Sequence, residues 1–456
     1  MRPSRRRWLV LLLIVAFAIR LAVGLAWQTR LSGRFGLGDS ESYWQLGRAI
    51  AEGKPYEYGP EHARIFRTPG YPLLLAPILR LAGDGWAGLL LGRAEAALFG
   101  TLAVLAIWWL ARLLFDDRAA SIAAILATFY PGAVALSVLI LSEAPFCPLM
   151  LLQIGLWVLA ARAKKPWPRA GWGFAAGLTA GAATLMRPSW LLFTPLAAVA
   201  FVLSQCGASN RSAAAGTAVQ NDPGADVPST AKRHAVAVAA AMLLGLVVAM
   251  TPWWVRNARV TGRFVPTTLQ VGASLYDGLS PNATGASNLE FADKLKNREL
   301  VFLSGGQAKP RRAGESWVAL EQRLDRQMRD AALDWAKSHP DRVLQLAGVK
   351  FLRMWNLWPN EPQLARNWAA RWAVVFTYTP LLILAIMGVW RTLDRGWPYI
   401  LCWLPAVYLT SLHLVFVSSL RYREPAMLAL LVLAAGEMTD WGSGIRGWWA
   451  RRRLRV

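Results

Sequence analysis

The sequence predicts an all-α polytopic membrane protein with about 10 transmembrane helices. Of its 456 residues, 55% are hydrophobic and 17% are charged, whereas soluble proteins carry about 25% charged residues. The apolar residues are gathered in blocks such as Ala119–Leu141, close to the ~20 residues that cross ~30 Å of hydrocarbon as a helix. This pattern excludes a soluble globular enzyme, a disulfide scaffold and a disordered chain.

Ten apolar blocks are predicted to span the membrane. In chain order they are Trp8–Trp27, Gly88–Leu110, Ala119–Leu141, Ala144–Ala161, Gly171–Met186, Trp190–Leu203, Ala235–Thr251, Trp372–Trp390, Trp397–Val417 and Pro425–Met438. The stretch from Gly171 to Leu203 is too long for one crossing, and Arg187-Pro188 divides it into a hairpin. Pro72–Ala82 is too short to cross and is expected at the interface, as is the amphipathic Val343–Trp358.

The cations set the orientation. The net charge of +23 does not indicate nucleic-acid binding, because the basic clusters flank the apolar blocks as they do in membrane proteins. With a cytoplasmic N-terminus every short cationic cluster falls inside, including Arg5–Arg7 and Arg451–Arg453. We therefore expect a multi-pass protein of the cytoplasmic (inner) membrane with both termini cytoplasmic. The three cysteines show no metal or disulfide spacing.

This topology divides the chain into three parts. Residues 1–251 form an N-terminal transmembrane module that contains a first outer loop, 28–85, and a flexible inner loop, 205–234. Residues 252–371 form a small outer segment lying on the membrane. Residues 372–456 form the last transmembrane helices and a basic cytoplasmic tail.

Ionisable residues gather near the outer ends of the predicted spans, where they are costly and usually functional. They are Arg20, Arg93, Glu95, Glu143, Arg187, His413, Arg421, Arg423 and Glu424, joined by Asp39 and Glu41 of the first outer loop. This distribution indicates one polar site at the outer interface. Arginines suit phosphate because their planar fork gives two parallel hydrogen bonds, and phosphate at that depth belongs to lipids.

Several motifs carry a family resemblance. They are Gly38-Asp39-Ser40-Glu41-Ser42-Tyr43-Trp44, Arg67-Thr68-Pro69-Gly70-Tyr71-Pro72, Leu141-Ser142-Glu143-Ala144-Pro145, Met186-Arg187-Pro188, Thr251-Pro252-Trp253-Trp254-Val255-Arg256-Asn257, Gly262-Arg263-Phe264-Val265-Pro266 and Arg421-Tyr422-Arg423-Glu424-Pro425. In this order the chain resembles the multi-spanning glycosyltransferases that use polyprenyl-phosphate sugars. These form the protein O-mannosyltransferase and aminoarabinose-transferase superfamily, and the likeness is to its family 39-like members.

The resemblance implies a GT-C-like fold and inverting sugar transfer from a polyprenyl-phosphate donor at the outer face. Asp39 falls on the position of the catalytic base or metal ligand; Ser40 separates it from Glu41, where many members have two adjacent acids. The expected substrate-binding residues are Glu41, Tyr43, Arg67, Tyr71, Arg93, Glu143, Arg187, Arg421, Tyr422 and Arg423. No organic cofactor is expected, and a divalent cation stays open. The acceptor, whether protein, lipid or glycan, is not determined.

Structural alternatives exist for these residues. Asp39 could cap a helix, Glu143 could be a first-turn acid favoured by the helix dipole, and the arginines could anchor the chain at headgroups. His413 is expected to be a packing residue. The alternative functions are a polysaccharide ligase or polymerase that uses lipid-diphosphate glycans, a transporter or flippase, and a scaffold protein without chemistry.

Overall fold

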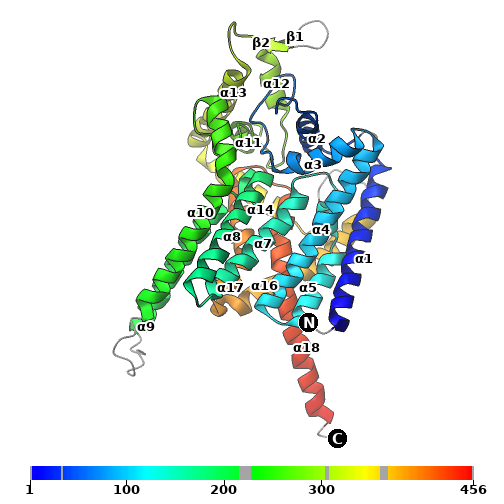
Figure 1. Cartoon of the computed structure of the whole chain (residues 1–456), viewed down its shortest axis with the longest axis vertical. Helices are drawn as coiled ribbons and strands as arrows, with labels where there is room; N and C mark the ends of the chain where they lie inside the picture. Colours follow the sequence, from blue (N-terminus) through cyan, green and yellow to red (C-terminus); the bar gives the residue numbers. More distant parts are fainter. Residues whose placement is uncertain (1–2, 32–33, 215–226, 303–307, 360–367, 454–456) are drawn as a thin grey trace.

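The structure, a computed structural model, describes residues 3–31, 34–214, 227–302, 308–359 and 368–453. Figure 1 shows a bundle of long helices with a smaller group of elements at its upper end. The first helix, α1 (Pro3–Gln28), begins at the lower end of this bundle, and the last, α18 (Leu420–Arg453), ends there. The predicted α-helical polytopic architecture is confirmed.

Seven helices in the described part of the chain are long and apolar enough to cross a membrane. Their crossing segments are Arg6–Gln28, Trp86–Leu114, Glu143–Arg162, Pro188–Gln205, Ala231–Thr261, Arg371–Arg395 and Trp397–Val415. The helices that form most of each segment are α1, α4 (Trp86–Leu114), α7 (Glu143–Arg162), α9 (Phe193–Ala214), α10 (Val227–Thr261), α16 (Trp368–Thr392) and α17 (Trp397–Val415). The predicted count of about ten is not confirmed, since the blocks at 119–141, 171–186 and 425–438 fall outside this set.

The prediction of one continuous span over Ala119–Leu141 is wrong. The chain forms α5 (Asp117–Phe129) and then the short α6 (Pro131–Leu136), because Pro131 cannot continue the helix of α5. Arg20 compensates for the break by donating to the carbonyl oxygens of Ala127, at 2.8 Å, and Thr128, at 3.4 Å. Its guanidinium thereby pairs backbone groups that have no water to bind at this depth.

The helix break predicted at Arg187-Pro188, between 171 and 203, is present. The helix α8 (Pro166–Met186) ends directly before Arg187, and the 3-10 turn η1 (Pro188–Trp190) leads into α9. Close packing of α8 on α10 depends on small residues, since a Cβ at Gly177 would lie 1.9 Å from the Met242 carbonyl oxygen. Within the predicted flexible inner loop, 205–234, residues 205–214 continue α9 and residues 227–234 begin α10, and residues 215–226 lie outside the described residues.

The C-terminal helix occupies the centre of the bundle. After the turn η2 (Leu393–Arg395), α17 and α18 complete the chain, and residues 426–435 of α18 are all buried. The first turn of α18 carries Arg421 to Glu424. Packing of this segment against α4, α5, α16 and α17 fixes where those charged residues lie.

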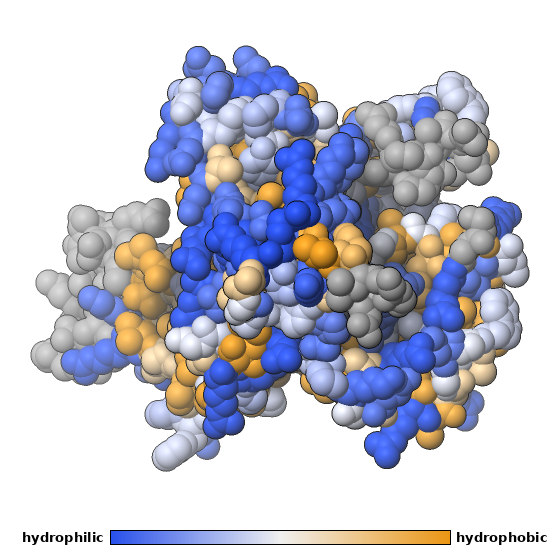
Figure 2. Space-filling model, turned by 90° about the horizontal axis from the view of Figure 1, so that it is seen from above, coloured by the Kyte–Doolittle hydropathy of each residue, from blue (hydrophilic) through white to orange (hydrophobic). Residues whose placement is uncertain are grey.

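The elements at the upper end come from the two segments expected to lie outside. The first outer loop forms α2 (Gly38–Ala51) and α3 (Gly70–Ala82), as the predicted interfacial helices. The second segment forms α11 (Val271–Gly278), α12 (Glu290–Arg298), the antiparallel pair β1 (Leu300–Phe302) and β2 (Ala308–Pro310), α13 (Trp317–Ser338) and α14 (Pro340–Trp355). Figure 2 views this end, where hydrophilic residues gather over the middle.

Candidate active site

Asp39 stands at the start of α2 with both carboxylate oxygens engaged. Arg67 Nη2 lies 2.6 Å from its Oδ1, and Arg421 Nη2 lies 3.0 Å from its Oδ2. The capping alternative is wrong, because the N-cap of α2 is Leu37 and receives no side-chain cap bond. Asp39 therefore joins α2 to the loop before α3 and to the start of α18.

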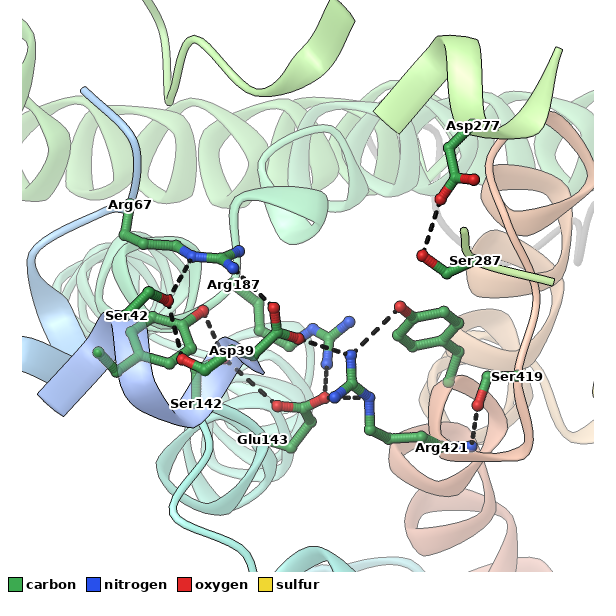
Figure 3. A network of polar contacts seen from close by, with 12 residues as sticks. Asp39, Ser42, Arg67, Ser142, Glu143, Arg187, Asp277, Ser287, Ser419 and Arg421 are labelled. Atoms are coloured by element: carbon green, nitrogen blue, oxygen red, sulfur yellow. Dashed lines mark hydrogen bonds and ion pairs between the residues drawn. The ribbon is translucent and has the colours of Figure 1, made fainter. Parts of the chain in front are cut away.

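Glu143 is also held by two arginines and is more deeply buried than Asp39. It is the first residue of α7, and its Oε1 lies 2.6 Å from Arg187 Nη1 and 3.0 Å from Arg421 Nε. Five side chains thus alternate in charge, in the order Arg67, Asp39, Arg421, Glu143 and Arg187 (Figure 3). We call these five the charge chain. All five were predicted from the sequence, and they converge from five separate segments.

The charge chain is open at one end and closed at the other. The side chain of Asp39 is 34% exposed and that of Arg67 is 24% exposed, whereas Glu143 is 3% exposed. Arg187, at 13%, is intermediate. A molecule that arrives from the outer elements therefore reaches Asp39, Arg67 and Arg421 first, and Glu143 braces Arg421 from below.

The electrostatics of the cluster favour an anion. Burial raises the pKa of Asp39, but Arg67 and Arg421 outweigh it and hold that pKa well below its usual range. Three guanidinium groups and two ionised carboxylates leave one net positive charge. Such a surplus, partly removed from water, suits a phosphate group.

Neighbouring hydroxyl groups hold the acids in place. Ser42 Oγ accepts a hydrogen bond from Arg67 Nε at 3.1 Å and donates to the Asp39 carbonyl oxygen at 2.8 Å. The Tyr43 hydroxyl donates to Ser142 Oγ at 3.1 Å, and the ring of buried Tyr71 meets the Tyr43 ring edge-on. Ser42 and Ser142 were not predicted as site residues. Ser42 lies three residues after Asp39, on the same side of a helix, which is the signal that could have found it.

Some side chains of the motif Arg421–Glu424 contact the charge chain, and others are buried in the helix bundle. The Tyr422 ring stacks on His413 with centroids 4.2 Å apart, and the guanidinium groups of Arg421 and Arg187 lie 5.1 and 5.4 Å from the Tyr422 centroid. His413 Nδ1 bonds the Val417 carbonyl oxygen at 2.7 Å, which agrees with the expected packing role. Tyr422 is thus a platform for two arginines of the charge chain.

Three of the predicted substrate-binding residues make their polar contacts away from the charge chain. Arg93 donates to Gln28 Oε1 and to the Val138 carbonyl oxygen, and so completes the pairing of the broken α5–α6 region. Arg423 donates to the carbonyl oxygens of Met354 and Asn356 and pairs with Glu424. Glu41 accepts a bond from Gln45 on α2. The contacts of these three side chains are structural.

The loop that supplies Arg67 is held by the outer segment. Glu321 of α13 is buried and accepts hydrogen bonds from the backbone N–H groups of Arg64, at 2.9 Å, and Ile65, at 3.0 Å. The Leu269 N–H donates to the Ile65 carbonyl oxygen at 2.9 Å. Trp253 and Asn257 of the Trp-Trp-Val-Arg-Asn motif in turn bond the Thr267 carbonyl oxygen. That motif therefore positions the loop without touching the charge chain.

Glu321 should make the stability of this junction depend on pH. Burial raises its pKa to about 7, against the two N–H bonds and Arg256. Between pH 4.5 and about 7, Glu321 holds a proton in the folded protein that it releases in the unfolded chain. The contribution of Glu321 to the free energy of unfolding therefore falls as pH rises. The difference in melting temperature between the parent and Glu321→Gln, measured in detergent across this range, should fall with rising pH. Asp334→Asn, exposed on the same helix, is the control. A difference that grows with pH would contradict the prediction.

The residues of the cluster do not fit a divalent cation. Each Asp39 oxygen already faces a guanidinium group, and Arg421 stands between the two carboxylates. Within the described part of the chain, no group of three or more His, Cys, Asp or Glu side chains is placed to hold a metal ion. We therefore derive no step through a metal.

Comparison with known proteins agrees with this geometry. Residues 66–218 match the sequence model of a family described as dolichyl-phosphate-mannose-protein mannosyltransferase. This region contains Arg67, Glu143 and Arg187. The predicted family resemblance is confirmed. No curated protein sequence matches the chain.

Solved structures of an archaeal oligosaccharyltransferase share the fold. The oligosaccharyltransferase AglB from Archaeoglobus fulgidus, in complex with an inhibitory peptide and a dolichol-phosphate, has 15% identity and a TM-score of 0.57, with 99% of this chain and 52% of that chain covered. The apo form of the Archaeoglobus fulgidus oligosaccharyltransferase has 15% identity and a TM-score of 0.57, with 100% of this chain and 53% of that chain covered. ArnT from Cupriavidus metallidurans, in the apo state, has 15% identity and a TM-score of 0.43, with 95% of this chain and 78% of that chain covered. The chain spans about half the length of the oligosaccharyltransferase it matches.

Proposed function

We propose that this protein is a glycosyltransferase that moves a sugar from a polyprenyl-phosphate lipid to an acceptor at the outer face of the cytoplasmic membrane. The observation that carries the proposal is the charge chain, in which three arginines outnumber two acids at the end of the spans. The family match and the shared fold support it, as does the dolichol-phosphate in the AglB complex. Both termini then lie in the cytoplasm.

In the proposed reaction the acceptor hydroxyl attacks the anomeric carbon of the sugar. The bond between that carbon and the phosphate oxygen breaks, the polyprenyl phosphate leaves with the electron pair, and configuration at the carbon inverts. Asp39 takes the proton of the attacking hydroxyl. Arg67, Arg187 and Arg421 stabilise the charge that grows on the phosphate.

The low pKa of Asp39 affects how it can act as the base in this reaction. A carboxylate held by two guanidinium groups is a weak base. An arriving phosphate competes for Arg67 and Arg421, the two side chains that hold Asp39. Sharing these arginines with the lipid raises the basicity of Asp39 only after the sugar lipid has bound.

Mass spectrometry of the lipid that copurifies with the protein tests the proposal. We expect a polyprenyl phosphate, with or without a sugar, in the parent protein and its loss in Arg67→Ala, because Arg67 is an exposed member of the charge chain. Arg48→Ala, whose side chain pairs with Glu52 and Asp84, should keep the lipid. A lipid diphosphate bearing a long glycan would favour a ligase instead. Ordinary phospholipid alone would contradict the proposal.

A further inference from the structure

The helix α14 presents an apolar surface that no described part of the protein covers. Leu344 is 76% exposed and Leu352 is 69% exposed, and Val349 and Phe351 are about half exposed. The opposite side of the helix is buried at positions four residues apart, and Lys350 is one of them, at 1% exposure. A cation turned inward and leucines turned outward reverse the pattern of a helix in water.

Lys350 places the middle of α14 at the level where a spanning helix ends. Its Nζ donates to the carbonyl oxygens of Gly278 at 2.9 Å, Leu414 at 3.1 Å and Val415 at 2.7 Å, which accounts for all three ammonium protons. Leu414 and Val415 are the last residues of α17. Lys350 therefore closes the C-terminal end of α17, where a cation is favoured by the helix dipole.

The second half of α14 continues below that level. Trp355, five residues after Lys350, donates from Nε1 to Thr410 Oγ1 at 3.0 Å, and Thr410 lies five residues before Val415. The two helices therefore run antiparallel. At 1.5 Å per residue, Thr410 lies about 7 Å below the end of α17 along its axis.

We propose that α14 from Leu344 onward is seated in the membrane leaflet on the side of the charge chain, with lipid acyl chains covering Leu344, Phe351 and Leu352. The apolar surface is continuous with that of the spanning helices. Val415 at the end of α17 is 43% exposed, and Trp358, just after α14, packs on Trp372 of α16 with ring centroids 5.2 Å apart. The first turn of α14 carries the exposed Asp341, Arg342 and Gln345, so the helix enters the leaflet at a slant.

This membrane seat connects to the site through short contacts. Arg353 Nε donates to the Ser418 carbonyl oxygen at 3.1 Å. Arg423 Nη1 donates to the Asn356 carbonyl oxygen, just past α14, at 2.6 Å. Arg421 lies between Ser418 and Arg423 in the sequence, so the depth of α14 in the lipid sets the height of Arg421 above the acyl chains.

Spin labels on single cysteines test directly whether α14 lies in the membrane leaflet. The background is the full chain with Cys147→Ala, Cys206→Ser and Cys402→Ala, in nanodiscs of phosphatidylethanolamine and phosphatidylglycerol. Labels go on L344C and L352C, with R326C on exposed α13 as the control. Molecular oxygen, which concentrates in hydrocarbon, should relax labels 344 and 352 more than a water-soluble nickel chelate does, most strongly at 352. Label 326 should show the reverse.

Two results would overturn the proposal. The first is a nickel-dominated profile at 344 and 352 like that at 326, which would place α14 in water. The second is a label at 352 that neither agent reaches, which would mean that protein, such as a second copy of the chain, covers this surface. Gel filtration of each labelled protein verifies that the fold is intact.

Discussion

Asp39→Asn is expected to reduce sugar transfer by two to four orders of magnitude while leaving expression nearly unchanged. The change keeps the size of the side chain and removes the basic carboxylate, whose general-base contribution is typically ~10²–10⁴-fold. It also removes the carboxylate that Arg67 and Arg421 share. Both arginines then lose one anion that competes with phosphate, so binding of the polyprenyl phosphate should be kept or strengthened while turnover is lost.

The measurement follows polyprenyl phosphate released from a polyprenyl-phosphate sugar by membranes that contain each variant. Separate kcat and KM values distinguish lost chemistry from lost binding. Glu41→Gln is the matched control, because Glu41 lies two residues away on α2 and its carboxylate accepts a hydrogen bond from Gln45 of the same helix. It should stay within a few fold of the parent. If Asp39→Asn also stays within a few fold, the base lies elsewhere, and Glu143 becomes the next candidate.

The depth of the site could be predicted because lipid imposes strict rules on sequence. Charged residues at the ends of apolar blocks cannot be scattered freely, so Asp39, Arg67, Glu143, Arg187 and Arg421 could be assigned to one level from topology alone. The structure joins all five by ion pairs. Depth was sufficient information for this set.

Depth does not give side-chain direction, and there the sequence interpretation was less successful. Arg93 lies at a similar level, but it donates to the carbonyl oxygen of Val138, which lies just past the end of α6 at Leu136. Hydropathy averages over Ala119–Leu141 and cannot detect the helix break at Pro131. The need for arginines there arises only once the break exists. Arg93 and Arg20 are thus consequences of a local structure that the apolar pattern hides.

The different directions of successive side chains along Arg421–Glu424 explain why Arg421 and Arg423 have different roles. Successive residues of a helix point about 100° apart, so Arg421 can face the charge chain while Arg423 faces the end of α14. The sequence shows two equivalent cations around a tyrosine. Only the packing of α18 against α14 and α17 distinguishes them, and that packing involves residues distant in sequence.

Arg421 should be the most sensitive arginine for binding of the lipid phosphate. It is the single member of the charge chain that contacts both acids, through Nη2 to Asp39 at 3.0 Å and through Nε to Glu143 at 3.0 Å. Arg421→Ala should weaken binding of polyprenyl phosphate by about 10- to 100-fold, the range expected for a lost hydrogen bond to a charged group. Arg421→Lys should recover little of it, because one ammonium group cannot replace a planar fork that binds in two directions.

The binding constant of a C55 polyprenyl phosphate, measured by native mass spectrometry, tests this expectation. Arg48→Ala controls for the loss of a cation, since Arg48 is exposed on α2 and pairs with Glu52 and Asp84. Unchanged binding in Arg421→Ala would place the phosphate site away from the charge chain. Full recovery by lysine would instead show that charge alone matters and that the two-directional contact of the guanidinium group does not. Loss in the alanine variant with poor recovery by lysine is the result that the geometry requires, because Arg421 must hold Asp39 and Glu143 apart while it turns a hydrogen-bond donor toward the lipid.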